Sequence, residues 1–206
     1  MDLVSLFFHL DEFLASIISE YGIWVYLILF LIIFLETGLI VTPFLPGDSL
    51  IFLAGTFAAM GSLDMVTLFG IMASAAIIGD SVNYYIGSRI GGKALHGKIP
   101  FVREEHMQKT REFYEKHGGK TIVIARFLPV IRTFAPFVAG VAGMKYRTFV
   151  AYNVIGAILW VGSFLTLGYF LGNIAFVREN LEVMVLAIVA LSVLPAVIGL
   201  LRNRKK

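Results

Sequence analysis

Residues 34–50 read FLETGLIVTPFLPGDSL, an apolar segment that carries two carboxylates and is interrupted by two prolines. A second segment of this kind, residues 125–136, reads ARFLPVIRTFAP and carries two arginines instead. Proline removes a backbone donor and breaks a helix in its interior. Broken backbone at membrane depth survives only where protein or water surrounds it. Both segments are therefore predicted to lie inside a membrane protein, away from lipid.

The composition agrees with a membrane protein. Of the 206 residues 58% are hydrophobic, and the mean hydropathy is +0.85, whereas a soluble domain is about 45–50% apolar. The net charge is +3 and there is no cysteine, which excludes disulfides, thiolate metal sites and a cysteine nucleophile. The basic residues are clustered, so we expect them to set membrane orientation and contact lipid headgroups, with no nucleic-acid partner.

The predicted fold is an all-α integral membrane protein with about four transmembrane helices and two opposed re-entrant helical hairpins. The amphipathic N-terminal helix is expected at residues 1–21, and the start lacks the basic region of a cleaved signal peptide. The expected spans are residues 22–41, 66–87, 149–172 and 181–201. The hairpins are expected at residues 36–61 and 121–144, with a cytoplasmic helical loop at residues 88–120.

The distribution of basic residues predicts the orientation. With re-entrant hairpins, 14 of the 17 Lys and Arg residues fall on one side, in the loop, after the second hairpin and in the tail. An excess of Lys and Arg marks the cytoplasmic side. Both termini are therefore predicted to be cytoplasmic.

A short internal repeat favours the two-hairpin arrangement. Phe-Leu-Pro occurs at residues 44–46 and again at 127–129, and the following spans end in GxxxG at 87–91 and 168–172. Repeats that enter from opposite faces build a midplane site in many transporters. Because few positions match, chance similarity remains an alternative.

The charges of the two broken segments are complementary. The first brings Glu36 and Asp48, and the second brings Arg126 and Arg132. A charge at the bilayer centre costs roughly 2.5–3.5 kcal/mol even on the lenient insertion scale. In one interpretation the four pair as structural salt bridges that hold the hairpins together. In the other, the arginines bind an anionic headgroup and a carboxylate exchanges a proton, because arginine offers paired donors and stays charged.

Three carboxylates are candidates for proton coupling or ion pairing, namely Glu36, Asp48 and Asp80. Asp48 follows a Pro-Gly step and is also placed to cap the N-terminus of a half-helix. Asp80 is also a candidate hydrogen-bond partner for a nearby polar residue or an embedded arginine. Asn153 and Trp160 are expected to be packing or interfacial residues.

Motifs for other chemistry are incomplete. Gly119-Lys120-Thr121 resembles the end of a Walker A loop, but Tyr114 stands where that motif needs a glycine. The sequence has no HExxH and no Gly-x-Ser-x-Gly. The four histidines fall outside the predicted spans, at His9, His96, His106 and His117. We therefore expect no enzyme activity, no cofactor and no metal site.

Several motifs together resemble the DedA family of VTT-type membrane proteins, over nearly the whole chain. They are FLETG at 34–38, PFLPGDSL at 43–50, GD at 79–80, YYIG at 84–87, FYEKHG at 113–118, ARFLP at 125–129, RTFAP at 132–136 and YNVIGA at 152–157. Each motif alone is weak, whereas the combination is specific.

The resemblance implies one DedA/VTT-type membrane domain over residues 1–206, in the bacterial inner membrane. It implies transport of undecaprenyl phosphate or a related phospholipid, driven by the proton-motive force. The partners would be membrane lipids and protons, and a homo-oligomer stays open. The family's acidic pair and arginine pair correspond here to Glu36, Asp48, Arg126 and Arg132.

Other functions stay open on the sequence alone. A proton-coupled exporter of small cations or drugs would use the carboxylates to bind its substrate. A non-selective phospholipid scramblase would move neutral and anionic lipids equally. A membrane enzyme acting on lipid phosphate would need a nucleophile or base near Arg126, and a structural factor would tolerate an apolar replacement of the buried charges.

Overall fold

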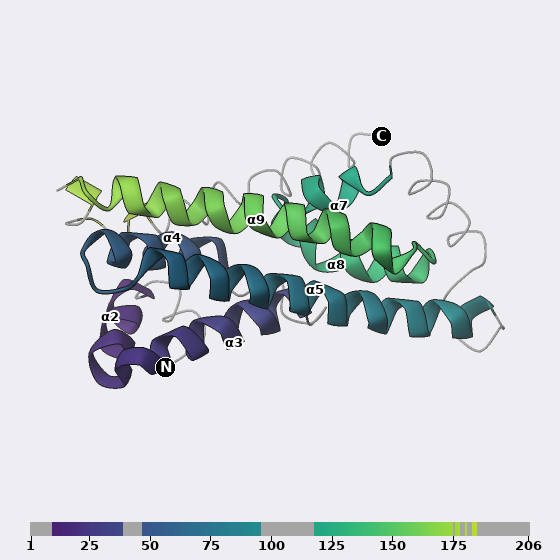
Figure 1. Ribbon diagram of the computed structural model, residues 1–206, viewed down its shortest axis with the longest axis horizontal. Coiled ribbons are helices and arrows are strands. Elements are labelled where there is room, and N and C mark those ends of the chain that lie inside the picture. Colours follow the sequence, from purple (N-terminus) through teal and green to yellow (C-terminus); the bar gives the residue numbers. More distant parts are fainter. Residues whose placement is uncertain are drawn as a thin grey trace, which may run out of the picture.

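The computed structural model describes residues 10–38, 47–95 and 118–174, together with 176–177, 180 and 183–184. Within this part of the chain every regular element is a helix (Figure 1). The elements are α2 (Leu10–Tyr21), the 3-10 helix η1 (Gly22–Trp24), α3 (Val25–Gly38), α4 (Gly47–Ala59), α5 (Met65–Leu95), α7 (Lys120–Ala125), α8 (Pro129–Val141) and α9 (Tyr146–Leu171).

Several predictions fall outside the described residues. They concern the start of the N-terminal helix, the Phe-Leu-Pro step at residues 44–46, most of the loop at 88–120, the span at 181–201 and the basic tail.

Two helices are long and apolar enough to cross a membrane. They are Met65–Ile90 within α5 and the whole of α9, with 26 residues each. At 1.5 Å per residue each is about 39 Å long, more than the roughly 30 Å of a hydrocarbon core. The helices run antiparallel, because Asn153 contacts Ile77 whereas Tyr146, earlier in α9, contacts Ser81, later in α5. They agree with the predicted spans at 66–87 and 149–172, and α5 continues beyond its predicted end to Leu95.

The start of α5 is capped by Asp64. The Thr67 amide donates to Asp64 Oδ1 at 2.8 Å, and the Thr67 hydroxyl donates to the same oxygen. These bonds hold the pKa of the exposed Asp64 carboxyl below its usual value. The Asp64 amide donates to the Tyr26 hydroxyl at 2.8 Å, which ties the beginning of α3 to the beginning of α5.

Helix α3 lies within the span predicted at residues 22–41, of which residues 39–41 fall outside the described part of the chain. It ends at Gly38, beside Gly79 at the midpoint of α5, where a Cβ on Gly38 would lie 3.3 Å from Gly79 Cα. The Gly47 amide donates to Glu36 Oε1 at 3.3 Å, which holds the start of α4 against the end of α3. Residues Gly22–Gly38 therefore form the first arm of a helical hairpin whose second arm is α4.

The two hairpins approach the middle of the molecule from opposite ends (Figure 1). Helices α3 and α4 lie along one half of the long axis, and α7 and α8 lie along the other half. The packing is reciprocal: α4 packs on α9, the long helix of the second half of the chain, and α8 packs on α5, the long helix of the first half. The order α3–α4–α5 is thus repeated as α7–α8–α9 in an inverted sense.

Four glycines allow these reciprocal contacts. A Cβ on any of them would collide with a backbone carbonyl of the facing helix. The pairs of glycine and carbonyl are Gly55 with Leu165, Gly168 with Phe52, Gly87 with Phe137, and Gly140 with Tyr84. Gly168 follows Gly87 by 81 residues, and Leu165 follows Tyr84 by 81 residues. The first glycines of the two GxxxG motifs therefore occupy equivalent places, which agrees with the predicted packing role.

We expect Gly55→Ala to lower the free energy of unfolding by about 1–3 kcal/mol, because the added methyl group overlaps the Leu165 carbonyl. Gly70→Ala is the matched control on α5, since nothing lies within 4 Å of the position its Cβ would take. There the substitution should be neutral or slightly stabilising. Thermal unfolding in detergent measures both variants, and equal midpoints would contradict the packing described here.

The apolar residues form an interior and an outer surface. The larger core cluster lies between α3, α4, α5 and α9, where Leu29, Ile51, Met72 and Leu165 are buried. A smaller cluster around Tyr84, Ala139 and Phe149 lies beside α8. Many large apolar side chains of the long helices nevertheless face outward, including Ile78, Ile158, Leu159 and Leu167. An apolar exterior around a packed interior is what lipid as a solvent requires.

Candidate functional site

Buried charges gather where the hairpins meet, in two clusters. The Arg132 cluster consists of Arg132 of α8, Glu36 of α3 and Asp48 of α4. Arg132 Nη2 pairs with Glu36 Oε1, and Arg132 Nη1 pairs with Asp48 Oδ1. Glu36 is 0% exposed, Asp48 7% and Arg132 8%. One guanidinium therefore binds a carboxylate from each arm of the first hairpin.

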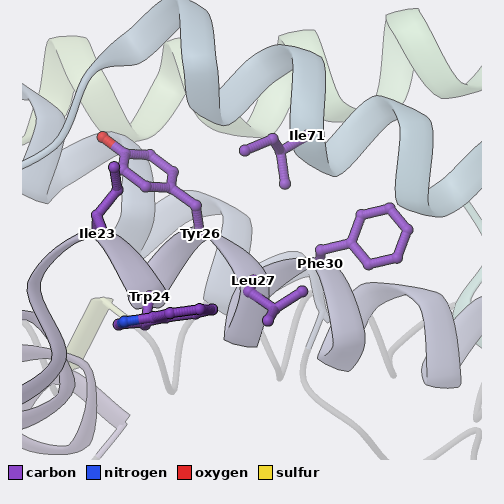
Figure 2. Close-up of a pocket in the computed structure, with 6 residues that line it drawn as sticks. All are labelled: Ile23, Trp24, Tyr26, Leu27, Phe30 and Ile71. Atoms are coloured by element: carbon purple, nitrogen blue, oxygen red, sulfur yellow. The ribbon is translucent and has the colours of Figure 1, made fainter.

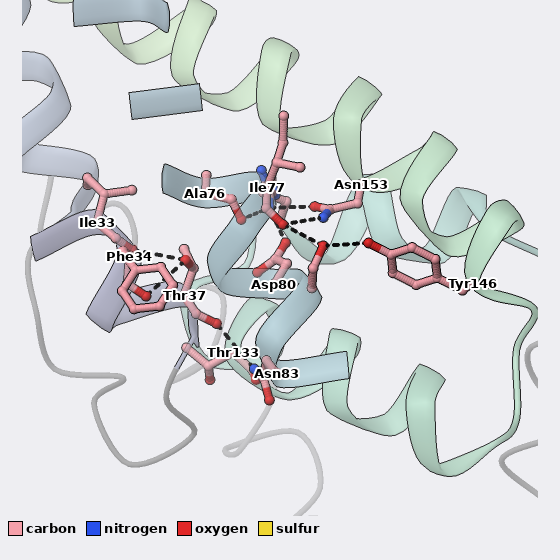
Figure 3. Close-up of polar contacts among 12 residues, drawn as sticks. Ile33, Phe34, Thr37, Ala76, Ile77, Asp80, Asn83, Thr133, Tyr146 and Asn153 are labelled. Carbon is pink, nitrogen blue, oxygen red and sulfur yellow. Dashed lines mark hydrogen bonds and ion pairs between the residues drawn. The ribbon is translucent and has the colours of Figure 1, made fainter. Parts of the chain in front are cut away.

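The Arg126 cluster consists of Arg126, Asp80 and Asn153. Arg126 lies in the break between α7 and α8, and its Nη2 pairs with Asp80 Oδ2 of α5. The same nitrogen donates to Asn153 Oδ1 of α9 at 2.9 Å. Figure 3 shows Asn153 reaching from α9 toward α5, where its amide donates to the Ile77 carbonyl at 3.1 Å. The second hairpin is thereby held to both long helices, at the midpoint of α5 and in the first half of α9.

Trp160, at the midpoint of α9, lies between the clusters and is 0% exposed. Its indole N–H donates to Asp48 Oδ1 at 2.8 Å. The guanidinium carbon of Arg132 lies 4.8 Å from the centre of the Trp160 ring, and that of Arg126 lies 5.7 Å away. Both distances are within the range of a cation–π interaction.

The sequence predicted part of this arrangement. The structure brings Glu36 and Asp48 to Arg132, as the complementary charges suggested, whereas Arg126 pairs with Asp80 on α5. Asp48 lies inside the first turn of α4, after the helix begins at Gly47. Its carboxylate binds Arg132 and Trp160.

Asn153 belongs to the Arg126 cluster and Trp160 contacts both clusters, although the sequence had suggested packing or interfacial roles. The signal available was their spacing of seven residues, which places both on one face of α9. Gly156 and Ala157 share that face and are also buried. Only the polar amide of Asn153 distinguishes this face from an ordinary apolar one.

Asn83 is a further polar residue that the sequence did not single out for this role. Its side-chain amide donates to the Thr133 carbonyl of α8 at 2.7 Å and to the Thr37 carbonyl of α3 at 3.2 Å (Figure 3). One side chain of α5 thus holds the ends of both hairpins. It is fully buried.

The charge of the clusters is unbalanced. Three carboxylates face two guanidinium groups, so the clusters carry a net charge of −1 when all five are ionised and become neutral with one bound proton. Three of their buried atoms have no hydrogen-bond partner in the described part of the chain, namely Glu36 Oε2, Arg126 Nη1 and Arg132 Nε. Among the same residues no group of three or more His, Cys, Asp or Glu side chains is placed to hold a metal ion.

An apolar groove of about 540 Å³ lies on the outside of the molecule, along α3 and facing α5 (Figure 2). Its lining residues are Ile23, Trp24, Tyr26, Leu27, Phe30 and Ile71. None of them is charged or belongs to either cluster.

The profile of the VTT domain matches residues 45–170, more than half of the chain. Protein DedA of Escherichia coli (strain K12) is 51% identical over 98% of this chain and 94% of its own length. The chain belongs to the DedA (VTT-domain) family. The matched region contains Asp48, Asp80, Arg126 and Arg132, while Glu36 lies before it.

Two other relatives in the family are named as membrane proteins. An uncharacterized membrane protein of Mycobacterium leprae is 45% identical over 82% of this chain and 76% of its own length. Inner membrane protein YghB of Escherichia coli (strain K12) is 34% identical over 76% of this chain and 72% of its own length. No solved structure matches the chain. Together with the two long apolar helices, these likenesses establish a membrane protein.

Proposed function

We propose that this DedA-family protein is a transporter, and not an enzyme, that carries the headgroup of a phosphate-bearing lipid across the inner membrane. The lipid is undecaprenyl phosphate or a related phospholipid, and protons are the coupling ion. The observation that carries the proposal is the pair of buried arginines, Arg126 bound to one carboxylate and Arg132 to two, between two hairpins that enter from opposite ends.

In this proposal α5 and α9 cross the membrane, and the hairpins α3–α4 and α7–α8 are re-entrant. The clusters then lie near the bilayer midplane, because they are at the midpoints of the two long helices. Inverted repeats with discontinuous helices place substrate sites at this depth in many transporters.

Transport requires that the arginines change partners. A phosphate group and a carboxylate compete for the same paired donors of a guanidinium. A proton bound to Glu36 or Asp48 weakens its hold on Arg132 and leaves the arginine able to bind phosphate. The lipid tail stays in hydrocarbon, so only the headgroup loses its water.

A second candidate function, export of small cations or drugs in exchange for protons, is favoured by the surplus carboxylate. In that case the acidic side chains bind the substrate, and the arginines only hold those side chains in position. The charge of the transported molecule distinguishes the two functions.

The test compares headgroup translocation of undecaprenyl phosphate with that of a neutral lipid in reconstituted liposomes. The arginine-free variant is Arg126→Ala/Arg132→Ala, and the control is Arg147→Ala, an exposed arginine at the start of α9. We expect the wild type and the control to translocate the phosphate lipid faster, and the arginine-free variant to lose this rate. Equal movement of both lipids indicates a scramblase. Movement of neither lipid above empty vesicles removes the lipid proposal in favour of the cation exporter.

A further inference from the structure

We infer that Trp160 is the positioning residue that couples the two charge clusters, holding both arginines in place while their carboxylate partners are neutralised. The inference rests on the proposed function, in which the arginines must exchange partners. Trp160 is buried at the midpoint of α9 and touches both clusters.

The first argument is the convergence of two donors on one oxygen. Asp48 Oδ1 accepts from Arg132 Nη1 and from Trp160 Nε1. An indole N–H can only donate, so it needs an acceptor such as this carboxylate oxygen. When Asp48 binds a proton, its oxygen becomes a weaker acceptor for both donors, and when it turns away, the indole and the guanidinium lose the same partner together.

The second argument concerns the ring. Both guanidinium groups lie within 6 Å of its centre, and a cation–π interaction is strongest where water is excluded. The ring attracts a guanidinium whether or not its carboxylate is charged. It therefore retains each arginine near the site during the interval in which the arginine has left its carboxylate and has not yet bound phosphate.

The third argument is that Trp160 contacts members of both clusters. Arg126 binds α5 and α9, whereas Arg132 binds α3 and α4. A displacement of either guanidinium changes the surroundings of the same indole. The titratable and charged groups around it are Glu36 of α3, Asp48 of α4, Asp80 of α5, Arg126 after α7 and Arg132 of α8.

The sequence provides a direct probe, because the chain has two tryptophans, Trp24 and Trp160. In the variant Trp24→Phe the indole fluorescence comes from Trp160 alone. The purified full-length variant is titrated from pH 9 to pH 5, and separately with undecaprenyl phosphate and with the neutral undecaprenol. We expect the emission to change on acidification and on addition of the phosphate lipid, with no change for undecaprenol. An emission that responds to neither acid nor the phosphate lipid overturns the inference.

Transport by two Trp160 variants gives an independent readout. Trp160→Leu removes both the ring and the N–H and should lower the rate about tenfold or more, within the range of a desolvated cation–π interaction. Trp160→Phe keeps a ring and loses the N–H, so it should retain more activity, with a pH profile displaced from that of the wild type. Trp24→Leu, at an exposed position, is the control and should transport normally.

The outcomes separate this inference from the proposed function. If the wild type transports the phosphate lipid and Trp160→Leu does so with the same rate and pH profile, the inference is wrong and the proposed function stands. If the wild type transports no lipid, the proposed function fails, and the fluorescence titration alone decides whether Trp160 senses protonation of the clusters. Thermal unfolding of each variant identifies a loss of rate that comes from misfolding.

Discussion

Arg132→Gln is expected to abolish transport and to lower the free energy of unfolding by about 3–5 kcal/mol, the usual effect of removing one partner from a buried ion pair. The reason is that Arg132 is the shared partner of Glu36 and Asp48, both of which are buried. Without the guanidinium two carboxylates face each other away from water. Thermal unfolding in detergent and translocation in liposomes measure the two effects.

The control is Arg147→Gln, because Arg147 is exposed at the start of α9. It should leave stability and transport unchanged. Adding Glu36→Gln to Arg132→Gln removes one of the two unpaired charges and should restore part of the stability without restoring transport. The account of the Arg132 cluster is wrong if Arg132→Gln is as stable as the Arg147 control.

Asp80→Leu is expected to lower the free energy of unfolding by a similar amount, about 3–5 kcal/mol, because it leaves the buried Arg126 without its carboxylate. In the double variant Asp80→Leu/Arg126→Leu both charges are gone, and most of the lost stability should return. Replacing a whole buried pair by apolar residues is often neutral or stabilising. Asn153 keeps its hydrogen bond to Ile77 in either variant.

The double variant also separates a structural pair from a transport site. If Arg126 binds phosphate, the double variant is stable and does not transport at the wild-type rate. A stable double variant with the wild-type rate would show that the pair serves only to hold the second hairpin against α5. Stability and rate must therefore be measured on the same preparation.

The existence of the hairpins and part of the site could be predicted from sequence. Prolines and opposite charges in two apolar segments are local features, and they indicated both broken segments and the meeting of Glu36 and Asp48 with an arginine. The positions of the two long helices followed from apolar length alone. These features depend on neighbours along the chain, which a sequence displays directly.

The remaining contacts depend on how helices pack, which the sequence does not display. The pairing of Arg126 with Asp80 is set by the register of α5 against the second hairpin. Trp160 and Asn153 occupy the same helical face as buried small residues, so their spacing fits packing as well as a site. The approach of Gly38 to Gly79 and the bond from Gly47 to Glu36 likewise join segments that lie apart in the sequence.

The most direct test of the central claim is translocation of undecaprenyl phosphate by the wild type in liposomes with and without an imposed pH gradient, beside a neutral lipid in the same vesicles. The account expects the phosphate lipid to move faster than the neutral lipid and its rate to change with the gradient. Equal rates for the two lipids, or a phosphate-lipid rate that the gradient leaves unchanged, would contradict a proton-coupled carrier of lipid phosphate.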